Sequence, residues 1–338
     1  MSTTIAIIGS GFGMYCLLPA FSNIENCKVV GICGKPSSRM NSFCEKFQVN
    51  HYTDWKEMIQ KEKPDAVAIA VIPKYQFEIA KFAIQNGIAV FAEKPLSTDY
   101  QNSLELNNLA KKFDVPNMID FEFPEIPEWV EAKCLLNDRV IGKISSIDVN
   151  WNFLSYDLSN NIKSWKTDIE QGGGAISLVL SHTLHYLEFF IGEITSVKSK
   201  ISSSPKSVNG ADTTIKMSIL FKNDCKGNID LDISDLDSQN HSIKFTGDNG
   251  TILLKNNSTS FVDNFQLILN KNNEDKEITA KKYLNKSNLM NEDDRVKIVK
   301  LLAKKFVDWC ELGEPSRPNF SDGVRVQHLI EMVKNSNQ

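Results

Sequence analysis

The chain has 338 residues, a formal net charge of −4 and an apolar content of 41%, which is enough for about two domains of roughly 150 residues each. Its basic residues are scattered, which argues against a nucleic-acid-binding surface. No apolar run reaches the ~18 residues of a membrane span, and the N-terminus lacks a signal-peptide pattern. Seven irregularly spaced cysteines, without a C-x-x-C pair, favour neither a disulfide framework nor a zinc site. These features predict a cytoplasmic protein that binds neither nucleic acid nor membrane.

The first eighteen residues contain an apolar run at 5–8, a glycine cluster and then helix-compatible residues. A strand, a glycine turn and a helix in this order are typical of the phosphate-binding start of a dinucleotide fold. Gly9 would allow a tight turn, and Gly11 a close approach to a pyrophosphate that faces the helix N–H groups. The spacing departs from G-x-G-x-x-G, because Met14 takes the place of the third glycine. The predicted coenzyme contacts here are Gly9, Gly11, Phe12 and Gly13.

The second expected strand, residues 28–33, ends without the Asp or Glu that NAD-specific sites use to hold the ribose 2′-hydroxyl. The loop that follows carries Lys35, Ser38 and Arg39, which could bind a 2′-phosphate through charge-assisted hydrogen bonds. The alternative is a solvated loop that happens to carry two cations. We therefore expect NADP in preference to NAD.

Strand-like and helical patterns alternate through the rest of residues 1–120. Apolar runs occur at 66–71, 88–92 and 115–121, with helical patterns at 54–61, 75–86 and 98–113. Alternation of this kind predicts a doubly wound parallel sheet, and therefore an α/β dinucleotide-binding domain. Ligands bind at the carboxyl ends of such strands, so Pro73 and Glu93 are further candidate coenzyme contacts.

The pattern changes near residue 120. Helical patterns at 128–136 and 172–191 flank a strand that ends at 153, and several strands joined by turns follow between 194 and 269. A run of strands predicts a mostly antiparallel sheet, and we expect an α+β domain over residues 121–338. Residues 247–250 are typical of a hairpin turn. Residues 271–291 are polar and are expected to form a mobile loop before two final helices, at 293–311 and 322–334.

Lys94 is the first candidate catalytic residue. It follows a parallel strand, and Pro95 biases its backbone toward an extended conformation. A lysine so placed can donate to a substrate hydroxyl or carbonyl oxygen and stabilise the alkoxide-like charge of hydride transfer. The alternative is an ordinary surface lysine after a strand.

His182 is the second candidate, as a proton carrier near neutral pH. It lies in a helix that starts after Gly172-Gly173-Gly174, three glycines that could bring the backbone close to a ligand, and it shares a face with Leu178 and His185. A hydrogen-bonded structural histidine is the alternative. No third ligand supports a His182/His185 metal site, so no metal is expected. Trp165 and Lys166 could line the substrate side or anchor a loop.

Several of these motifs together resemble one family. Gly9-Ser10-Gly11, Phe91–Ser97, Val140–Ile144, Gly172–His182 and Pro318–Val326 occur in the order and spacing of the Gfo/Idh/MocA oxidoreductases. The resemblance spans nearly the whole chain. It implies an N-terminal Rossmann domain and a C-terminal domain with a large open sheet that often forms a dimer face, hence a homodimer or homotetramer. It also implies NAD(P)-dependent oxidation or reduction of a sugar, cyclitol or sugar nucleotide.

By this resemblance, Lys94 corresponds to the family's substrate and nicotinamide lysine, and His182 to its catalytic histidine. The chain departs from the family at three places. The family commonly has Asp at the position of Leu178 and often has Asp at the position of His185. It often has a histidine at the position of Gln76. These departures do not change the expected fold or cofactor, but they concern the residues that would transfer the proton between substrate and solvent.

Two main functions follow, with a third kept open. The first is an oxidoreductase that exchanges hydride with a hydroxyl-bearing carbon, with Lys94 stabilising the oxygen and His182 moving the proton. The second is a non-catalytic NAD(P)-binding sugar sensor or regulatory protein, which Leu178 and Met14 favour. Reduction of an imine or a tetrapyrrole-like substrate is the third.

Overall fold

The computed structural model describes residues 2–205, 207, 210–235, 239–280 and 293–337. The chain divides into two compact units, one of residues 1–122 and 286–327 and the other of residues 123–285 and 328–338. The segment 286–327 groups with the first unit because helix α9 (Val296–Leu312) packs on α1 (Leu18–Ser22). The predicted domain boundary after residue 120 stays a prediction.

The first unit is built on a six-stranded parallel sheet with the order β3-β2-β1-β4-β5-β6. Its strands are β1 (Thr3–Ile8), β2 (Cys27–Cys33), β3 (Asn50–Tyr52), β4 (Ala66–Ile69), β5 (Ala89–Ala92) and β6 (Asn117–Ile119). The strand order reverses between β1 and β4, and open α/β sheets bind ligands outside the strand ends at such a point. The predicted doubly wound sheet is confirmed. Strand β3 was not predicted, because three exposed or half-buried polar residues give no apolar run.

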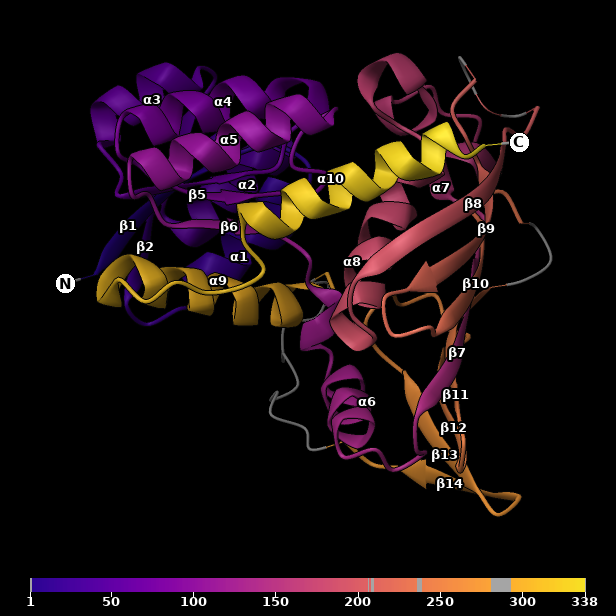
Figure 1. Ribbon diagram of the computed structural model, residues 1–338. Coiled ribbons are helices and arrows are strands. Elements are labelled where there is room, and N and C mark those ends of the chain that lie inside the picture. Colours follow the sequence, from indigo (N-terminus) through magenta and orange to yellow (C-terminus); the bar gives the residue numbers. More distant parts are fainter. Residues whose placement is uncertain (1, 206, 208–209, 236–238, 281–292, 338) are drawn as a thin grey trace. The chain divides into compact units, whose positions relative to one another are not determined.

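Helices cover both faces of this sheet. Figure 1 shows α3 (Trp55–Glu62), α4 (Pro73–Gln85) and α5 (Tyr100–Lys112) on one face, with α1 and α9 on the other. Strands β4 and β5 are therefore buried along their whole length, as is usual for parallel strands that are covered twice. The unit also contains α2 (Ser38–Phe47) and the start of α10 (Phe320–Asn335).

The second unit is built on an eight-stranded sheet with the order β14-β13-β12-β11-β7-β10-β9-β8. Only β7 and β10 pair in parallel among these strands, so the predicted, mostly antiparallel sheet is confirmed. The strands are β7 (Ile144–Asn152), β8 (Ile194–Ser202), β9 (Thr214–Phe221), β10 (Lys226–Asp232), β11 (Asn240–Gly247), β12 (Gly250–Asn256), β13 (Gln266–Lys271) and β14 (Glu274–Ile278). The expected hairpin turn joins β11 to β12, with Gly247 paired to Gly250.

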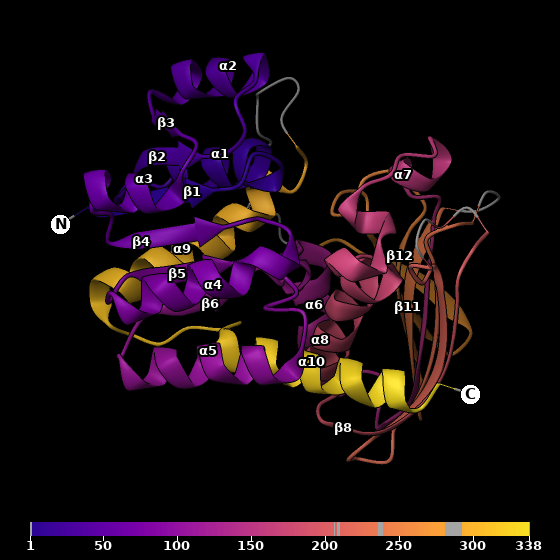
Figure 2. The ribbon, with the colours of Figure 1, turned by 90° about the horizontal axis from the view of Figure 1, so that it is seen from above.

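One face of this sheet carries the helices of the unit. Figure 2 shows the sheet nearly edge-on, with α6 (Pro127–Asn137) and α8 (Ser181–Phe190) on the same side. Aromatic rings pack between these helices and the sheet. The ring centroids are 5.0 Å apart for Trp129 and Tyr186 and 5.0 Å apart for Phe190 and Phe245.

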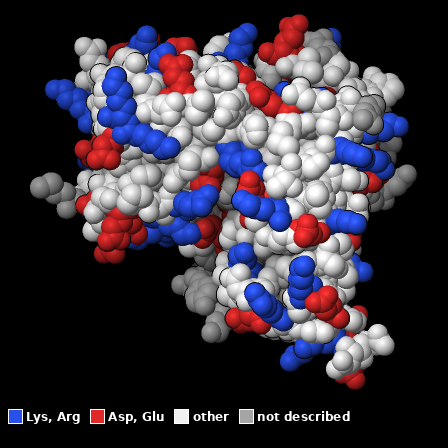
Figure 3. All heavy atoms as spheres, in the orientation of Figure 1, with Lys and Arg blue, Asp and Glu red and all other residues white. Residues whose placement is uncertain are grey.

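Figure 3 shows that acidic and basic side chains are interspersed on the face drawn there.

The expectation of a loop at 271–291 was wrong for residues 274–278, which form β14, and residues 281–291 lie outside the described part of the chain. Asn272 and Asn273 have φ values of 54° and 62°, a left-handed pair suited to a two-residue hairpin turn. The strand was missed because it is an exposed, charged edge strand without apolar alternation. The irregular stretch after residue 153 also contains α7 (Tyr156–Ser159) and short 3₁₀ turns at Trp165–Thr167 and Ile169–Gln171.

Candidate functional site

The glycine turn after β1 combines one tightly packed glycine with one open one. A Cβ on Gly9, whose φ is +139°, would lie 2.1 Å from the carbonyl oxygen of Ala70, whereas a Cβ on Gly11 would meet no protein atom within 4 Å. Helix residues begin at Phe12 and pass through a wide π-helical turn at Gly13–Leu17 before α1. The first N–H groups of a helix have no intrahelical partner and attract anions. The turn therefore has the features of a phosphate-binding turn, and the space beside Gly11 is open.

Phe12, a predicted coenzyme contact, is held by two neighbours. Its ring meets the Tyr15 ring edge-on at 5.7 Å, and the Arg295 guanidinium lies 4.8 Å from the ring centroid. Arg295 is in turn paired with Asp293, with Nη2 to Oδ2 at 2.8 Å. Sequence reasoning missed Arg295, because it precedes α9 and is nearly 300 residues from the glycine turn. A cation at this place could contribute to holding a negatively charged coenzyme.

The loop after β2 lies against the glycine turn. A Cβ on Gly34 would be 2.7 Å from the Cβ of Ser10, so the two segments are in close contact. The hydroxyl of Ser37 caps α2 by accepting from the Met40 N–H at 3.0 Å. The candidate 2′-phosphate ligands Lys35, Ser38 and Arg39 are all exposed. No acidic side chain stands at the end of β2, where Cys33 is the last residue.

Lys94 is half-buried in a turn that leaves the carboxyl end of β5 through a cis Lys94–Pro95 peptide. The side-chain amide of Gln76, which is 1% exposed on α4, holds this turn. Its Nε2 donates to the carbonyl oxygens of Glu93 at 2.5 Å, Pro95 at 2.9 Å and Leu96 at 3.2 Å. Pro73 begins the same helix, so the predicted contacts Pro73, Glu93 and Lys94 all lie at one end of the parallel sheet.

Three carboxyl groups accompany the Lys94 ammonium, and two of them were not predicted. Glu93 follows β5 and Asp120 follows the adjacent β6, with Glu122 two residues further on. Burial raises the pKa of Glu93, raises that of Asp120 well above its usual range and raises that of Glu122 to about 7. Burial also lowers the pKa of Lys94, and the charges of Glu93 and Glu122 oppose that effect. The strand-end position of Asp120, equivalent to that of Glu93, was the signal that could have revealed it.

His182 is 5% exposed and is the second residue of α8, directly after a π-helical turn at Ile176–Leu180. Its imidazole lies against Phe123, with 4.7 Å between the ring centroids. Leu178, within the π-helical turn, and His185 are both half-buried. His182 is thus a buried imidazole on a helix, and the helical position agrees with the sequence-based prediction.

Two of the three glycines before this helix, Gly173 and Gly174, approach protein groups closely. A Cβ on Gly173 would lie 2.1 Å from the Trp165 carbonyl oxygen, and one on Gly174 would lie 2.4 Å from Oδ1 of Asp212. The sequence predicted that a ligand would come close to the backbone here. At Gly173 and Gly174 the groups that come close are instead parts of the same chain. Trp165 is half-buried and Lys166 exposed, and their carbonyl groups line this contact.

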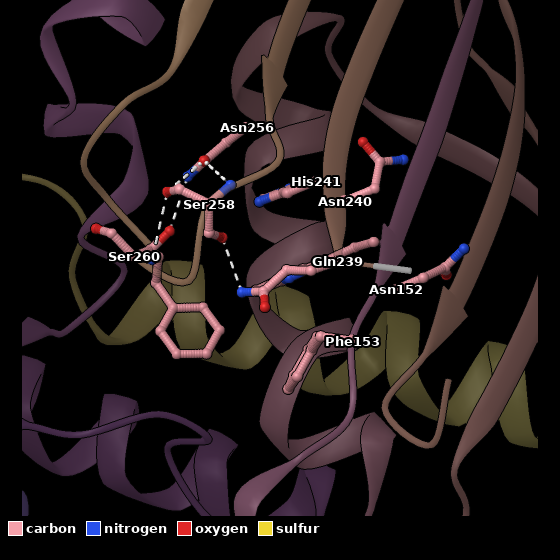
Figure 4. Close-up of a pocket in the computed structure, with 10 residues that line it drawn as sticks. Asn152, Phe153, Gln239, Asn240, His241, Asn256, Ser258 and Ser260 are labelled. Carbon is pink, nitrogen blue, oxygen red and sulfur yellow. Dashed lines mark hydrogen bonds between the residues drawn. The ribbon is translucent and has the colours of Figure 1, made fainter. Parts of the chain in front are cut away.

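A separate pocket lies at the ends of β7, β11 and β12 (Figure 4). The loop after β12 is wound around Asn256, whose Oδ1 accepts from the N–H of Ser258 at 2.9 Å and from its hydroxyl at 2.8 Å. Gln239 donates to the Ser258 carbonyl oxygen at 2.8 Å. On one wall the His241 and Trp151 rings are stacked at 4.2 Å. None of the predicted site residues lines this pocket.

The described residues contain no group of three or more His, Cys, Asp or Glu side chains that could hold a metal ion. All seven cysteines are free thiols. Across the same residues, no helix combines the length and the apolar character that crossing a membrane requires.

Residues 3–121 match the family profile described as "Oxidoreductase family, NAD-binding Rossmann fold", and residues 133–338 match its "C-terminal alpha/beta domain". The chain belongs to the Gfo/Idh/MocA oxidoreductase family. The predicted enzyme class and the NAD(P)-binding Rossmann domain are thereby confirmed.

Relatives within the Gfo/Idh/MocA family include an uncharacterized oxidoreductase of Synechocystis, 25% identical over 99% of this chain and 94% of the relative. The levoglucosan dehydrogenase of Pseudarthrobacter phenanthrenivorans is 26% identical over 48% of this chain and 43% of its own length.

Two solved structures share the fold over almost the full chain. A levoglucosan dehydrogenase in complex with NADH has a TM-score of 0.85 at 19% identity, covering 99% of this chain and 97% of that one. KijD10, a 3-ketoreductase from Actinomadura kijaniata in complex with NADP, has a TM-score of 0.84 at 17% identity, covering 100% and 98%.

Proposed function

We propose that this oxidoreductase transfers hydride between a nicotinamide coenzyme and a hydroxyl- or carbonyl-bearing carbon of a sugar, cyclitol or sugar nucleotide. The observation that carries the proposal is the Lys94 turn. Its lysine side chain is half-buried at the sheet end that holds the glycine turn. Burial lowers the pKa of Lys94, and the charges of Glu93 and Glu122 oppose that effect. The levoglucosan dehydrogenase among the relatives supports a sugar-like substrate.

In this proposal Lys94 donates a hydrogen bond to the reacting oxygen and stabilises the negative charge that develops on it. The coenzyme, when bound, supplies or accepts the hydride. His182 gives or takes the proton of the substrate hydroxyl. Trp165, Lys166, Leu178 and His185 contact the substrate, and position 178 is an apolar leucine where the family resemblance implies a carboxylate.

For the coenzyme we propose NADP rather than NAD. Lys35, Ser38 and Arg39 are exposed at the start of α2, and no carboxylate closes β2. The structural neighbours bind both coenzymes, NADH in the levoglucosan dehydrogenase and NADP in KijD10. We further propose a homodimer or homotetramer, which light scattering of the purified protein would test.

A second candidate is an NAD(P)-binding sugar sensor without turnover. Leu178, half-buried one helical turn before His182, favours it, because an apolar side chain cannot orient an imidazole by hydrogen bonding.

The test measures coenzyme oxidation and coenzyme binding together, with NADPH and NADH, against aldoses, anhydrosugars, cyclitols and sugar nucleotides. We expect turnover with at least one sugar-like compound. Lys94→Ala should lower kcat by about 100-fold or more, because it removes the charge that stabilises the reacting oxygen. The coenzyme dissociation constant should change by less than about threefold, since the pyrophosphate contacts remain.

Lys111→Ala is the matched control, because Lys111 is an exposed lysine on α5 of the same unit. Undiminished turnover in Lys94→Ala would remove this lysine from the mechanism. Binding of coenzyme and sugar without turnover across the whole panel would favour the sensor.

A further inference from the structure

The turn that precedes the His182 helix is clamped from two sides by other parts of the second unit. On one side, the N–H of Gly173 donates to the Asp168 carbonyl oxygen at 2.9 Å and that of Gly174 to the Lys166 carbonyl oxygen at 2.8 Å. On the other side stands Asp212, which precedes β9 and is 5% exposed. Gly174 has a φ of +102°, and its missing side chain leaves room for the Asp212 carboxylate.

Asp212 takes the place of a helix cap. The first helical residues have no side-chain cap of their own, since Ala175 stands at the cap position. Asp212 Oδ2 accepts from the Ile176 N–H at 2.7 Å, and the Asp212 carbonyl oxygen accepts from the Ala175 N–H at 2.8 Å. Two backbone donors that a helix start leaves without intrahelical partners are thus satisfied by one residue, 36 positions away from Ile176 in the sequence.

The hydrogen bonds continue from Asp212 to the neighbourhood of the imidazole. Ile176 donates its N–H to Asp212, and its carbonyl oxygen accepts from the N–H of Ser181 across the π-helical turn. Ser181 immediately precedes His182. A π-helical turn is wider than an α-helical one and is rarely stable by itself, so its geometry depends on what holds its first residue.

The carboxylate is costly to keep at this place. Burial raises the pKa of Asp212, while its hydrogen bond from Ile176 lowers it. An uncharged cap residue within the helix would satisfy the same donor without burying a charge.

We propose that Asp212 is a positioning residue for the reaction: it fixes the start of the helix and thereby the orientation of the His182 imidazole and of the Trp165–Lys166 segment. The inference rests on the proposed role of His182. Asp212 itself touches no reacting atom in this assignment.

The test compares Asp212→Ala and Asp212→Asn with Ser199→Ala. Ser199 is the matched control, because it is also buried in the second unit and donates to the Val333 carbonyl oxygen at 2.7 Å. Backbone amide hydrogen exchange over residues 174–185 is measured by mass spectrometry. The kcat and the KM values for coenzyme and for substrate are measured with the substrate that the panel of sugars, cyclitols and sugar nucleotides identifies. We expect local exchange about tenfold faster in Asp212→Ala, a smaller rise in Asp212→Asn, and none in Ser199→Ala.

In the same order, kcat should fall about tenfold or more in Asp212→Ala and a few-fold in Asp212→Asn, while the coenzyme KM stays unchanged, because the loss is in orientation and not in coenzyme binding. If Asp212→Ala does not fold, Asp212→Asn decides by the same two measurements. Unchanged exchange over residues 174–185, or a kcat equal to that of Ser199→Ala, would overturn the inference. Absence of turnover in the unmodified protein would instead refute the proposed function, and the exchange measurement would still test whether Asp212 holds the helix start.

Discussion

The two glycine-rich turns of this chain look similar in sequence but differ in what occupies the space beside them. In the first unit, a side chain on Gly11 would meet no protein atom within 4 Å. In the second unit, side chains on Gly173 and Gly174 would collide with the Trp165 carbonyl oxygen and the Asp212 carboxylate. The first turn is packed at Gly9 but open at Gly11, whereas the second is filled by the chain at both Gly173 and Gly174.

This difference shows that a glycine cluster has two physical causes that the sequence does not separate. Glycine is needed wherever another group approaches the backbone closely, and that group can be a ligand or a distant part of the same protein. The charges differ as well. The open turn shares its sheet end with Lys94 and three carboxyl groups, whereas the filled one lies between two backbone carbonyl groups and the buried Asp212 carboxylate.

The largest expected effect is that of Gly174→Ala. A methyl group there would meet both a strained φ of +102° and the Asp212 carboxylate, so the free energy of unfolding should fall by about 4 kcal/mol in denaturant titration. The control is Gly192→Ala, in the same unit, where φ is +113° but no protein atom lies within 4 Å. It should lose only about 1.5 kcal/mol. An equal loss of unfolding free energy in the two variants would show that the Asp212 carboxylate does not fill the space beside Gly174.

Arg39→Ala should act on the coenzyme and leave the fold unaffected. If its guanidinium binds the 2′-phosphate, the dissociation constant of NADPH should rise at least about tenfold, by loss of a charge-assisted hydrogen bond, with little change for NADH. Lys28→Ala removes an exposed cation near the start of β2, the strand that precedes α2, and serves as the control. Equal weakening of both coenzymes would contradict the assignment to a 2′-phosphate.

Gly11→Ala tests the open turn directly. The added methyl group finds no protein neighbour, so the free energy of unfolding should change by less than about 0.5 kcal/mol. The dissociation constant of the preferred coenzyme should nevertheless rise about fivefold to tenfold, because the pyrophosphate would lose its close approach to the backbone. Calorimetric titration measures the binding. Unaltered affinity would mean that the space beside Gly11 is not used.

The smallest effect concerns the carboxyl groups beside Lys94. Burial raises the pKa of Glu122 to about 7, above the value of about 4.3 that is usual for an unfolded chain. The folded state therefore binds more protons between these two values, and stability declines as the pH rises through 7. Glu122→Gln should reduce this decline by about 1 kcal/mol, as measured by melting temperatures from pH 5 to pH 8. If the melting temperature of the variant depends on pH in the same way as that of the unmodified protein, the group that titrates is not Glu122.

The parts of the fold that the sequence predicted well are those with strong periodicity. The apolar runs of β1, β4 and β5 and the alternation of Ile215, Met217 and Ile219 reflect burial, which local sequence records directly. Strands β3 and β14 were missed because they are short or exposed and depend on pairing with a neighbour.

The site divides in the same way. The positions of Lys94 and His182 at a strand end and on a helix follow from motifs, because each motif is continuous in the chain. Arg295 and Asp212 could not be found so, since each meets its partners only after folding and comes from a different sequence region. The strand-end position of Asp120 could have revealed it, but its burial beside Glu93 could not be read from the sequence. Their chemistry depends on burial and on neighbouring charge, neither of which a linear pattern contains.

Gln76 offers a last consequence. Its carboxamide ties together three carbonyl groups around the Lys94 turn, and a carboxamide gains or loses no proton in water. A histidine at that place would become a cation in mild acid and change which partners it can hold. The backbone of the turn that presents the lysine is thus held by a group that does not titrate, and the acid sensitivity of this region lies in the carboxyl groups of Glu93, Asp120 and Glu122.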